Sequence, residues 1–230
     1  MSKTVIVTGA AGNLGTAVVE KFLAEDYYVL ATVEPGTRHP FNPNQARLEI
    51  HELDVTDEVA ARQFVQSVFE VHKTVQAAVL LVGGFAMGSI AETGLYELEK
   101  MFQLNFFSAY NLVRPAFLRM QWQSGGGRMV LIGARPALDP ADGKGKMAYA
   151  LSKSLLFKLS ELLNAAGEDK NVASSVIVPS IIDTPANRAA MPNADFSAWV
   201  RAEDLAAKIE QACRLESEPR EKVVKVYGGV

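Results

Sequence analysis

The sequence predicts an α/β protein built on one doubly wound parallel sheet, with helices on both faces. Two observations lead to this fold class. Short β-branched or fully apolar segments alternate with segments whose apolar residues recur at helical spacing, along all 230 residues. The chain also shows no linker, internal repeat or low-complexity segment. Because regular strand–helix alternation is typical of βαβ units, we expect a single domain over residues 1–230.

The expected elements follow in a regular order. We expect strands at 4–8, 28–33, 48–53, 77–82, 128–132, 173–178 and 222–226. Helices are expected from residue 14, and at 59–71, 95–107, 111–123, 147–166 and 201–213. The strand at 77–82 is apolar throughout, as a parallel strand buried on both faces is. The stretches 35–47, 138–146 and 184–199 are expected to be irregular, and long loops of this kind often carry function.

Composition excludes several classes of protein. The chain is 49% hydrophobic and carries 23 basic against 26 acidic residues, a net charge of −3, which argues against binding to nucleic acid or anionic lipid. One cysteine, Cys213, excludes an internal disulfide framework and is expected to be a buried helix residue. The histidines at 39, 51 and 72 lack metal-ligand spacing, so we expect no metal site. Neither a leader peptide nor a membrane span is expected, which favours a cytoplasmic location.

A glycine-rich turn separates the first strand from the first helix. Gly9 would allow the tight turn, Gly12 would let backbone approach a pyrophosphate, and Gly15 would let the helix pack close to the sheet. The helix start at Asn13 and Leu14 would offer N–H groups to the phosphates. The alternative is an ordinary glycine-rich turn. The strand–turn–helix context favours dinucleotide binding, and with it an NAD(P)-binding Rossmann fold.

Acidic residues end the second and third strands. Glu34 can accept hydrogen bonds from both ribose hydroxyls and repels a 2′-phosphate, which favours NAD(H) over NADP(H). Alternatively Glu34 is a solvated strand end, and Arg38 in the next loop could pair a 2′-phosphate. Asp54, before Val55, either accepts from the adenine amino group or caps the following helix.

The ends of the fourth strand and of one later helix carry further candidates. Gly83 and Gly84 follow the fourth strand, where glycine permits a flat ligand to approach; the alternative is a simple turn. Tyr149 and Lys153 are four residues apart and therefore share one helix face. An ammonium near a phenol lowers the phenol pKa from about 10, so we expect Tyr149 to give a proton as hydride arrives. The alternative is a surface tyrosine beside a helix lysine.

Taken together and in order, these motifs resemble the short-chain dehydrogenase/reductase family over nearly the whole chain. The matching residues are the glycine-rich turn, Asp54-Val55, Gly83-Gly84, Asn105, Tyr149 with Lys153, and Pro179 through Thr184. The resemblance implies that Tyr149 is the proton donor and that Lys153 tunes it and holds the nicotinamide ribose. Asn105 would support a water and proton relay beside Lys153. Pro179, Ile182 and Thr184 would lie along the nicotinamide.

Two stretches, 133–139 and 183–199, are most similar to the dihydropteridine reductases within this family. Ala134 stands where most family members place a serine that binds the substrate carbonyl, and the subgroup shares this gap. Asn105, in contrast, matches the broad family better than the subgroup. The resemblance implies reduction of a quinonoid dihydropterin or another small conjugated ring compound. We expect Phe85, Ala134, Met191 and Trp199 to contact such a substrate.

Several alternatives stay open at this point. Residues 185–199 form either a lid that closes over a flat substrate or an ordinary surface loop with hydrophobic anchors. The activity is alternatively that of a general carbonyl or alcohol dehydrogenase, or the chain is a non-catalytic dinucleotide-binding scaffold or sensor. The helix at 147–166 has an apolar face that includes Leu151 and Leu162, which a core helix would also show. The family resemblance implies pairing through this helix and the one near Asn105, in a homodimer or homotetramer.

Overall fold

The computed structural model describes residues 3–42, 44–215 and 222–228. Its centre is a seven-stranded sheet with the order β3-β2-β1-β4-β5-β6-β9, in which every neighbouring pair is parallel. The strands are β1 (Thr4–Val7), β2 (Tyr28–Val33), β3 (Leu48–Glu52), β4 (Ala77–Leu80), β5 (Gly127–Ile132), β6 (Val172–Pro179) and β9 (Val223–Val226). The predicted doubly wound α/β fold is confirmed, and each strand lies within two residues of its expected bounds.

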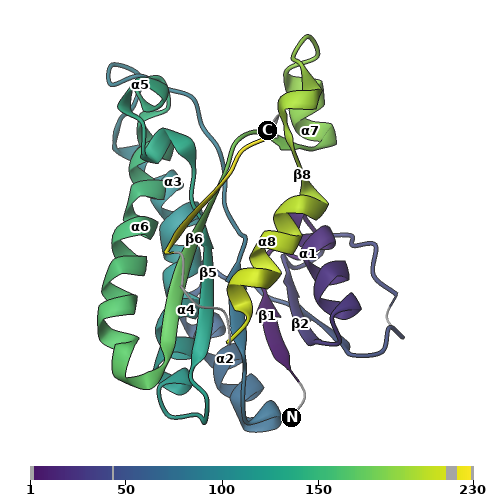
Figure 1. Ribbon diagram of the computed structural model, residues 1–230. Coiled ribbons are helices and arrows are strands. Elements are labelled where there is room, and N and C mark those ends of the chain that lie inside the picture. Colours follow the sequence, from purple (N-terminus) through teal and green to yellow (C-terminus); the bar gives the residue numbers. More distant parts are fainter. Residues whose placement is uncertain (1–2, 43, 216–221, 229–230) are drawn as a thin grey trace.

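Helices cover both faces of this sheet (Figure 1). One face packs against α1 (Asn13–Ala24) and α8 (Ala202–Cys213), which share a buried cluster with alternate residues of the strands. The other packs against α2 (Glu58–His72), α4 (Ser108–Met120) and α6 (Met147–Gly167). The central strands β1, β4 and β5 are buried along their whole length because they are covered on both sides. Cys213 is fully buried, as expected.

The region around Asn105 differs from the expected break between two helices. Helix α3 (Leu95–Phe102) continues through a π-helical turn (Gln103–Phe107) directly into α4. A π-helical turn widens the helix by one residue and often marks a functional position. It buries the Asn105 side chain, which is 1% exposed.

Two stretches expected to be irregular contain short helices. Helix α5 (Pro140–Gly143) lies between β5 and α6, after a 3-10 turn at Arg135–Ala137. Helix α7 (Pro185–Ala190) and a 3-10 turn at Phe196–Ala198 occupy the stretch expected to be a loop. A small parallel pair of strands, β7 (Ile182–Asp183) and β8 (Val200–Arg201), joins the two ends of the segment 184–199. In Figure 1, α5 and α7 stand apart at the top of the molecule.

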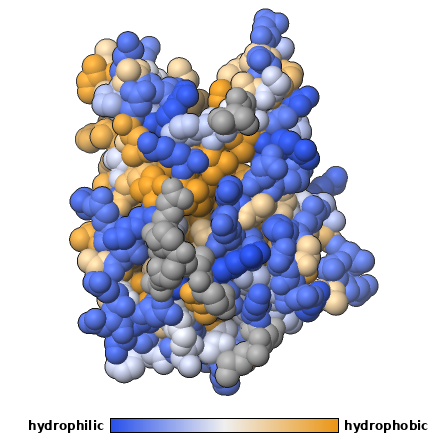
Figure 2. Space-filling view, viewed as in Figure 1, coloured by the Kyte–Doolittle hydropathy of each residue, from blue (hydrophilic) through white to orange (hydrophobic). Residues whose placement is uncertain are grey.

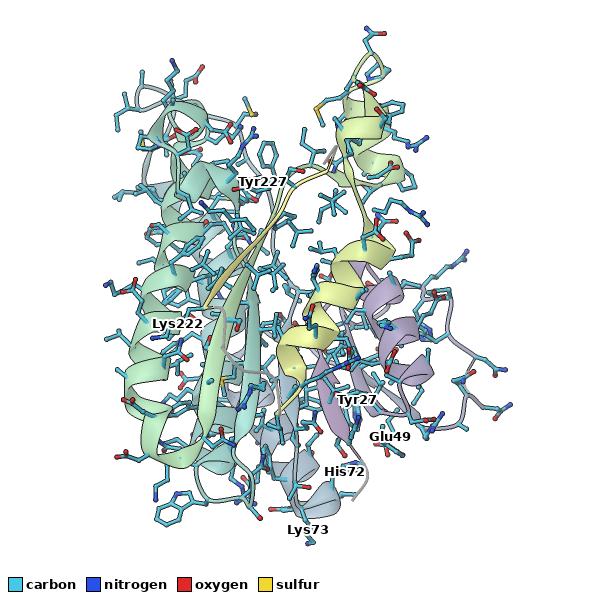
Figure 3. The ribbon with its side chains drawn as sticks, in the orientation of Figure 1. Tyr27, Glu49, His72, Lys73, Lys222 and Tyr227 are labelled. Atoms are coloured by element: carbon cyan, nitrogen blue, oxygen red, sulfur yellow. The ribbon has the colours of Figure 1, made fainter. Side chains whose placement is uncertain are left out.

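The strand order fixes where a ligand can bind. The chain proceeds from β1 outward through β2 and β3, then returns to place β4 on the other side of β1. Ligands of doubly wound sheets bind at the carboxyl ends of the strands beside such a reversal. That edge is the upper one in the figures. In Figure 3, Tyr227 just after β9 lies near this edge, whereas Glu49 and His72 lie toward the opposite end. No helix in the described residues is long and apolar enough to cross a membrane.

Candidate active site

The predicted site residues gather at the carboxyl edge of the sheet, between α5 and α7. Figure 2 shows the molecule hollowed there, with hydrophobic surface at the floor of the hollow. The turn after β1, the turn after β4, the end of β5 and the first turn of α6 all reach this edge. Within the described residues, no cluster of histidine, cysteine, aspartate or glutamate could hold a metal ion.

The glycine-rich turn is shaped as the sequence predicts. Gly9 has a φ of +64°, a backbone conformation that favours glycine. A β-carbon at Gly15 would lie 2.1 Å from the Gly9 carbonyl oxygen, so α1 approaches the turn too closely for any side chain. Gly12 occupies the N-cap position of α1, and no side chain caps this end of the helix. Gly12 and Asn13 are exposed, which leaves the positive end of the helix open to an anion.

The carboxylates after β2 and β3 have different surroundings. Glu34 is exposed, and its carboxylate has no hydrogen-bond or ion-pair partner among the described residues. Asp54 accepts hydrogen bonds from the backbone N–H and the hydroxyl of Thr56, at 2.8 and 2.7 Å. Helix α2 is capped by Asp57, whose carboxylate accepts from the N–H groups of Val59 and Ala60. Asp54 is therefore not the helix cap, and its second oxygen remains free for a ligand.

Asn105 ties the turn after β4 to helix α6. Its side-chain oxygen accepts from the Gly84 N–H at 2.9 Å, and its amide nitrogen donates to the Gly84 carbonyl at 3.1 Å. The same nitrogen donates to the Ser152 hydroxyl at 3.0 Å, and that hydroxyl donates to the Tyr149 carbonyl at 2.8 Å. Ser152 was not expected from the sequence, because only the folded chain brings it to Asn105. This chain of hydrogen bonds fixes the first turn of α6 against β4.

Lys153 lies beneath the same turn. Its ammonium donates to the Ile132 carbonyl at 2.9 Å, and its side chain is almost fully buried. Burial lowers the pKa of Lys153 from its usual 10.5 to about 8. A β-carbon at Gly83 would lie 3.1 Å from Lys153 Nζ and 2.6 Å from Asn105 Oδ1. Gly83 is thus the position at which Lys153 and Asn105 meet, and only glycine fits there.

Tyr149 projects from the first turn of α6. Its ring meets the ring of Phe85 edge-on, with centroids 5.0 Å apart and planes at 71°. Among the described residues its hydroxyl has no hydrogen-bond partner, so it remains available to a substrate. Burial and, second, the charge of Asp142 raise the pKa of Tyr149 to about 12. The expected lowering of this pKa by Lys153 is therefore not found: burial and the Asp142 charge are the causes of the shift, and Lys153 is not among them.

Residues 133–137 follow β5, pack against α6 and form the wall beside Tyr149. This wall has no serine hydroxyl. Ala134 follows β5, is 5% exposed and begins the 3-10 turn at Arg135–Ala137. Gly133 before it allows no side chain, since a β-carbon would lie 2.7 Å from Val176 and 2.8 Å from Phe157. The substrate-side donor that most family members supply from this position is thus missing from the wall itself.

Residues 179–199 lie across the hollow from α5. Pro179 ends β6, and Ile182 begins β7, with its carbonyl accepting from the Asn187 side chain at 2.8 Å. Thr184 caps α7, because its hydroxyl accepts from the Asn187 N–H at 3.1 Å.

The outer part of this segment is ordered by its own contacts. Arg188 forms a two-pronged ion pair with Asp183, at 2.6 and 2.7 Å, and its guanidinium lies 4.7 Å from the Phe196 ring. Phe196 in turn packs on Trp199, with ring centroids 4.8 Å apart. Trp199 is only 7% exposed, whereas Met191 is partly exposed. The segment contains a short helix and a 3-10 turn and is not the irregular loop expected from the sequence.

Comparison with known proteins identifies the family of this chain. The family model described as short chain dehydrogenase matches residues 3–195. A dihydropteridine reductase from Dictyostelium discoideum is 27% identical over 225 residues, 95% of this chain and 91% of that protein. The 3-oxoacyl-acyl-carrier-protein reductase MabA of Mycobacterium bovis is 28% identical over 190 residues, 82% of this chain and 73% of that protein.

Solved structures confirm the fold. The structure described as ElxO with NADP bound superimposes with a TM-score of 0.88 at 21% identity, covering 98% of this chain and 97% of that one. The resemblance to dihydropteridine reductases expected from the sequence is confirmed, at 27% identity. With the family model matching most of its length, the chain belongs to the short chain dehydrogenase family of nicotinamide-dinucleotide-dependent oxidoreductases.

Proposed function

We propose that this enzyme reduces a quinonoid dihydropterin or a closely similar conjugated ring compound, with Tyr149 as the proton donor. The observation that carries this proposal is the wall beside Tyr149, where buried Ala134 offers no second hydroxyl. A substrate that needs such a donor loses on the order of 10²–10³ in rate without it. A conjugated ring that becomes more stable on reduction needs this donor less. The Dictyostelium dihydropteridine reductase, 27% identical over nearly the whole chain, supports the same substrate class.

The described residues fit a nicotinamide dinucleotide. The open start of α1 at Gly12 and Asn13 would hold its pyrophosphate, and Asp54 and Val55 would hold its adenine. Gly83 and Gly84 carry no side chain, so a flat ligand could approach their backbone closely, whereas a β-carbon at these positions would press on Asn105 or Leu104. When bound, this cofactor supplies the hydride. Pro179, Ile182 and Thr184, together with Lys153, would hold its nicotinamide end.

The chain's own residues provide the proton. With a pKa near 12, the Tyr149 phenol stays protonated at neutral pH, which is the form a donor needs. Phe85 packs against the ring of Tyr149 and so holds it beside the hollow. With a pKa of about 8, Lys153 is mostly protonated at neutral pH and would return a proton to Tyr149 after the step. Asn105 keeps both groups in place through Gly84 and Ser152.

We propose NADH as the preferred cofactor. The exposed carboxylate of Glu34 at the end of β2 can bind both ribose hydroxyls and repels a 2′-phosphate. Arg38 in the same loop is the group that would favour NADPH instead. The solved structure of ElxO holds NADP, although at 21% identity it supports the fold alone.

We also propose that residues 185–199 act as a lid and that the chain pairs with a second copy. The Arg188–Phe196–Trp199 contacts would let the lid move as one unit over the substrate. Leu118 on α4 and Leu151 and Leu162 on α6 are 50%, 43% and 61% exposed, an unpartnered apolar surface on these two helices. Sedimentation of the protein alone tests the pairing, and a monomer at micromolar concentration would contradict it.

The function is tested by following nicotinamide absorbance with quinonoid dihydropterin, using NADH and NADPH in parallel. We expect rapid oxidation of NADH and slower oxidation of NADPH. If neither is oxidised although both bind, the pterin substrate is wrong. The second candidate, reduction of a carbonyl, is favoured by the 28% identity to the mycobacterial 3-oxoacyl reductase. Turnover of simple ketones at a comparable rate, despite Ala134, would support this candidate instead.

A further inference from the structure

An ion-pair cluster occupies the turn between β5 and α6. Asp142 on α5 accepts from Arg135 Nε at 3.0 Å and from Lys146 Nζ at 2.6 Å. The Asp142 side chain is 17% exposed, so solvent screens these pairs less than ordinary surface pairs. Arg135 lies next to Ala134, and Lys146 immediately precedes α6. The three charges therefore connect both ends of the turn.

The two sides of this turn also pack closely, and the turn leads directly into α6, which carries Tyr149. A β-carbon at Gly143 would lie 2.6 Å from the Pro136 carbonyl oxygen, which shows how closely the two sides of the turn pack. Gly88 forms a parallel bridge beside Lys146: its N–H donates to the Gly145 carbonyl at 2.8 Å, and its carbonyl accepts from the Met147 N–H at 2.9 Å. Gly88 belongs to the segment that carries Phe85, the ring packed on Tyr149.

Asp142 also acts on Tyr149 by its charge. The helical elements packed against α6 include α3, α5, the π-helical turn and the 3-10 turn. The charged residues of these elements, of the turn around α5 and of the start of α6 are Glu97, Glu99, Lys100, Arg135, Asp139, Asp142, Lys144, Lys146 and Lys153. Of these groups, Asp142 is the one whose charge raises the pKa of Tyr149.

We propose that Asp142 is a positioning residue of the active site, which fixes Tyr149 and Phe85 in place through its ion pairs with Arg135 and Lys146 and acts on the Tyr149 hydroxyl by its negative charge. The inference rests on the proposed function, in which Tyr149 gives a proton to the substrate. Nothing in the sequence pattern distinguishes Asp142 from the other acidic residues of this turn. Its ion pairs with Arg135 and Lys146 distinguish it in the folded chain.

The test compares Asp142→Asn with Asp139→Asn. Asp139 lies in the same turn and caps α5 through the Ala141 N–H at 2.9 Å, a contact that asparagine can also make. Both variants lose one negative charge, but only Asp142→Asn releases Arg135 and Lys146. Tyrosinate absorbance is titrated in Asp142→Asn and in Asp142→Asn/Tyr149→Phe, without cofactor or substrate. The difference between the two curves reports Tyr149 alone.

We expect Tyr149 to ionise at a lower pH in Asp142→Asn than in the parent protein, and at an unchanged pH in Asp139→Asn. Because reduction needs the protonated phenol, its rate falls as pH rises through the Tyr149 pKa, above the fall that loss of the Lys153 proton near pH 8 would cause. This upper alkaline limit of kcat/KM should therefore also move to lower pH in Asp142→Asn. Asp142→Glu, which restores the carboxylate, should recover most of the parent profile.

Two results would overturn the inference: an unchanged Tyr149 titration in Asp142→Asn, or an equal loss of activity at every pH with the alkaline limit in place. The second result would mean that Asp142 has only a general structural role. The proposed function fails separately, if Tyr149→Phe retains the full rate. The tyrosinate titration keeps its meaning in that case, because it involves no turnover.

Discussion

The ring of Phe85 packs edge-on against the ring of Tyr149, with centroids 5.0 Å apart. Phe85 is 60% exposed, although its ring packs against that of Tyr149. An exposed aromatic ring at this place presents a flat apolar surface to whatever enters the hollow. It also limits the positions that the Tyr149 ring can adopt. One contact thus connects this apolar surface with the phenol that we propose as the proton donor.

Replacing Phe85 by alanine should lower kcat/KM for the ring substrate by about 2- to 12-fold, the value of one aromatic pair. Most of the loss should be in KM, because the substrate loses its flat contact surface. Steady-state kinetics measure it. Met87→Ala is the matched control, since Met87 is similarly exposed on the same segment and has no aromatic contact with Tyr149. Equal losses in both variants would contradict a specific role for Phe85.

Gly83→Ala should weaken cofactor binding and activity together. Its β-carbon would lie 2.6 Å from Asn105 Oδ1, so the Asn105 side chain must move and give up its hydrogen bonds with Gly84. Fluorescence titration with NADH measures the binding. Gly145→Ala is the control, because nothing lies within 4 Å of its β-carbon position. Normal cofactor binding by Gly83→Ala would show that the turn is less constrained than its geometry indicates.

Lys153→Met should stabilise the free protein while abolishing its activity. Burial lowers the pKa of Lys153 to about 8 from 10.5, so the unfolded chain holds this proton more tightly than the folded one. The loss in free energy of unfolding that buried Lys153 causes is complete below pH 8, decreases as pH rises, and is absent above pH 10.5. At pH 7 it is on the order of 3 kcal/mol, less the hydrogen bond to Ile132. Urea unfolding should therefore show a larger gain for Lys153→Met at pH 7 than at pH 10. An equal gain at both would contradict the lowered pKa.

Glu34→Ala should reduce the preference for NADH over NADPH. Removal of this carboxylate removes both the ribose hydrogen bonds and the repulsion of a 2′-phosphate. The ratio of kcat/KM for the two cofactors should fall by about tenfold, with Arg38 then free to favour the phosphate. Arg38→Ala is the reciprocal variant and should move the ratio in the other direction. If neither substitution changes the ratio, the ribose is bound elsewhere.

The strands and the glycine-rich turn could be predicted because local features determine them. A run such as Ala77–Leu80 is apolar throughout, and the glycines at 9, 12 and 15 stand between a strand and a helix. The π-helical turn around Asn105 could not be predicted. It depends on the side-chain contacts with Gly84 and Ser152, which are 21 and 47 residues away along the chain.

The pKa values of the site residues could not be predicted from the sequence either. The spacing of Tyr149 and Lys153 correctly places both on the first turns of α6, but it carries no information on burial. Burial decides the pKa of both groups, lowering that of Lys153 and raising that of Tyr149. The role of Asp142 depends on ion pairs across a turn that the sequence indicated only as irregular.

Tyr149→Phe tests whether Tyr149 gives the proton during reduction. The substitution removes only the hydroxyl and leaves the ring against Phe85. With saturating NADH and quinonoid dihydropterin, we predict that the rate falls by about 10²–10⁴ while NADH binding is unchanged. A variant that keeps the full rate would contradict the assignment of Tyr149 as the donor.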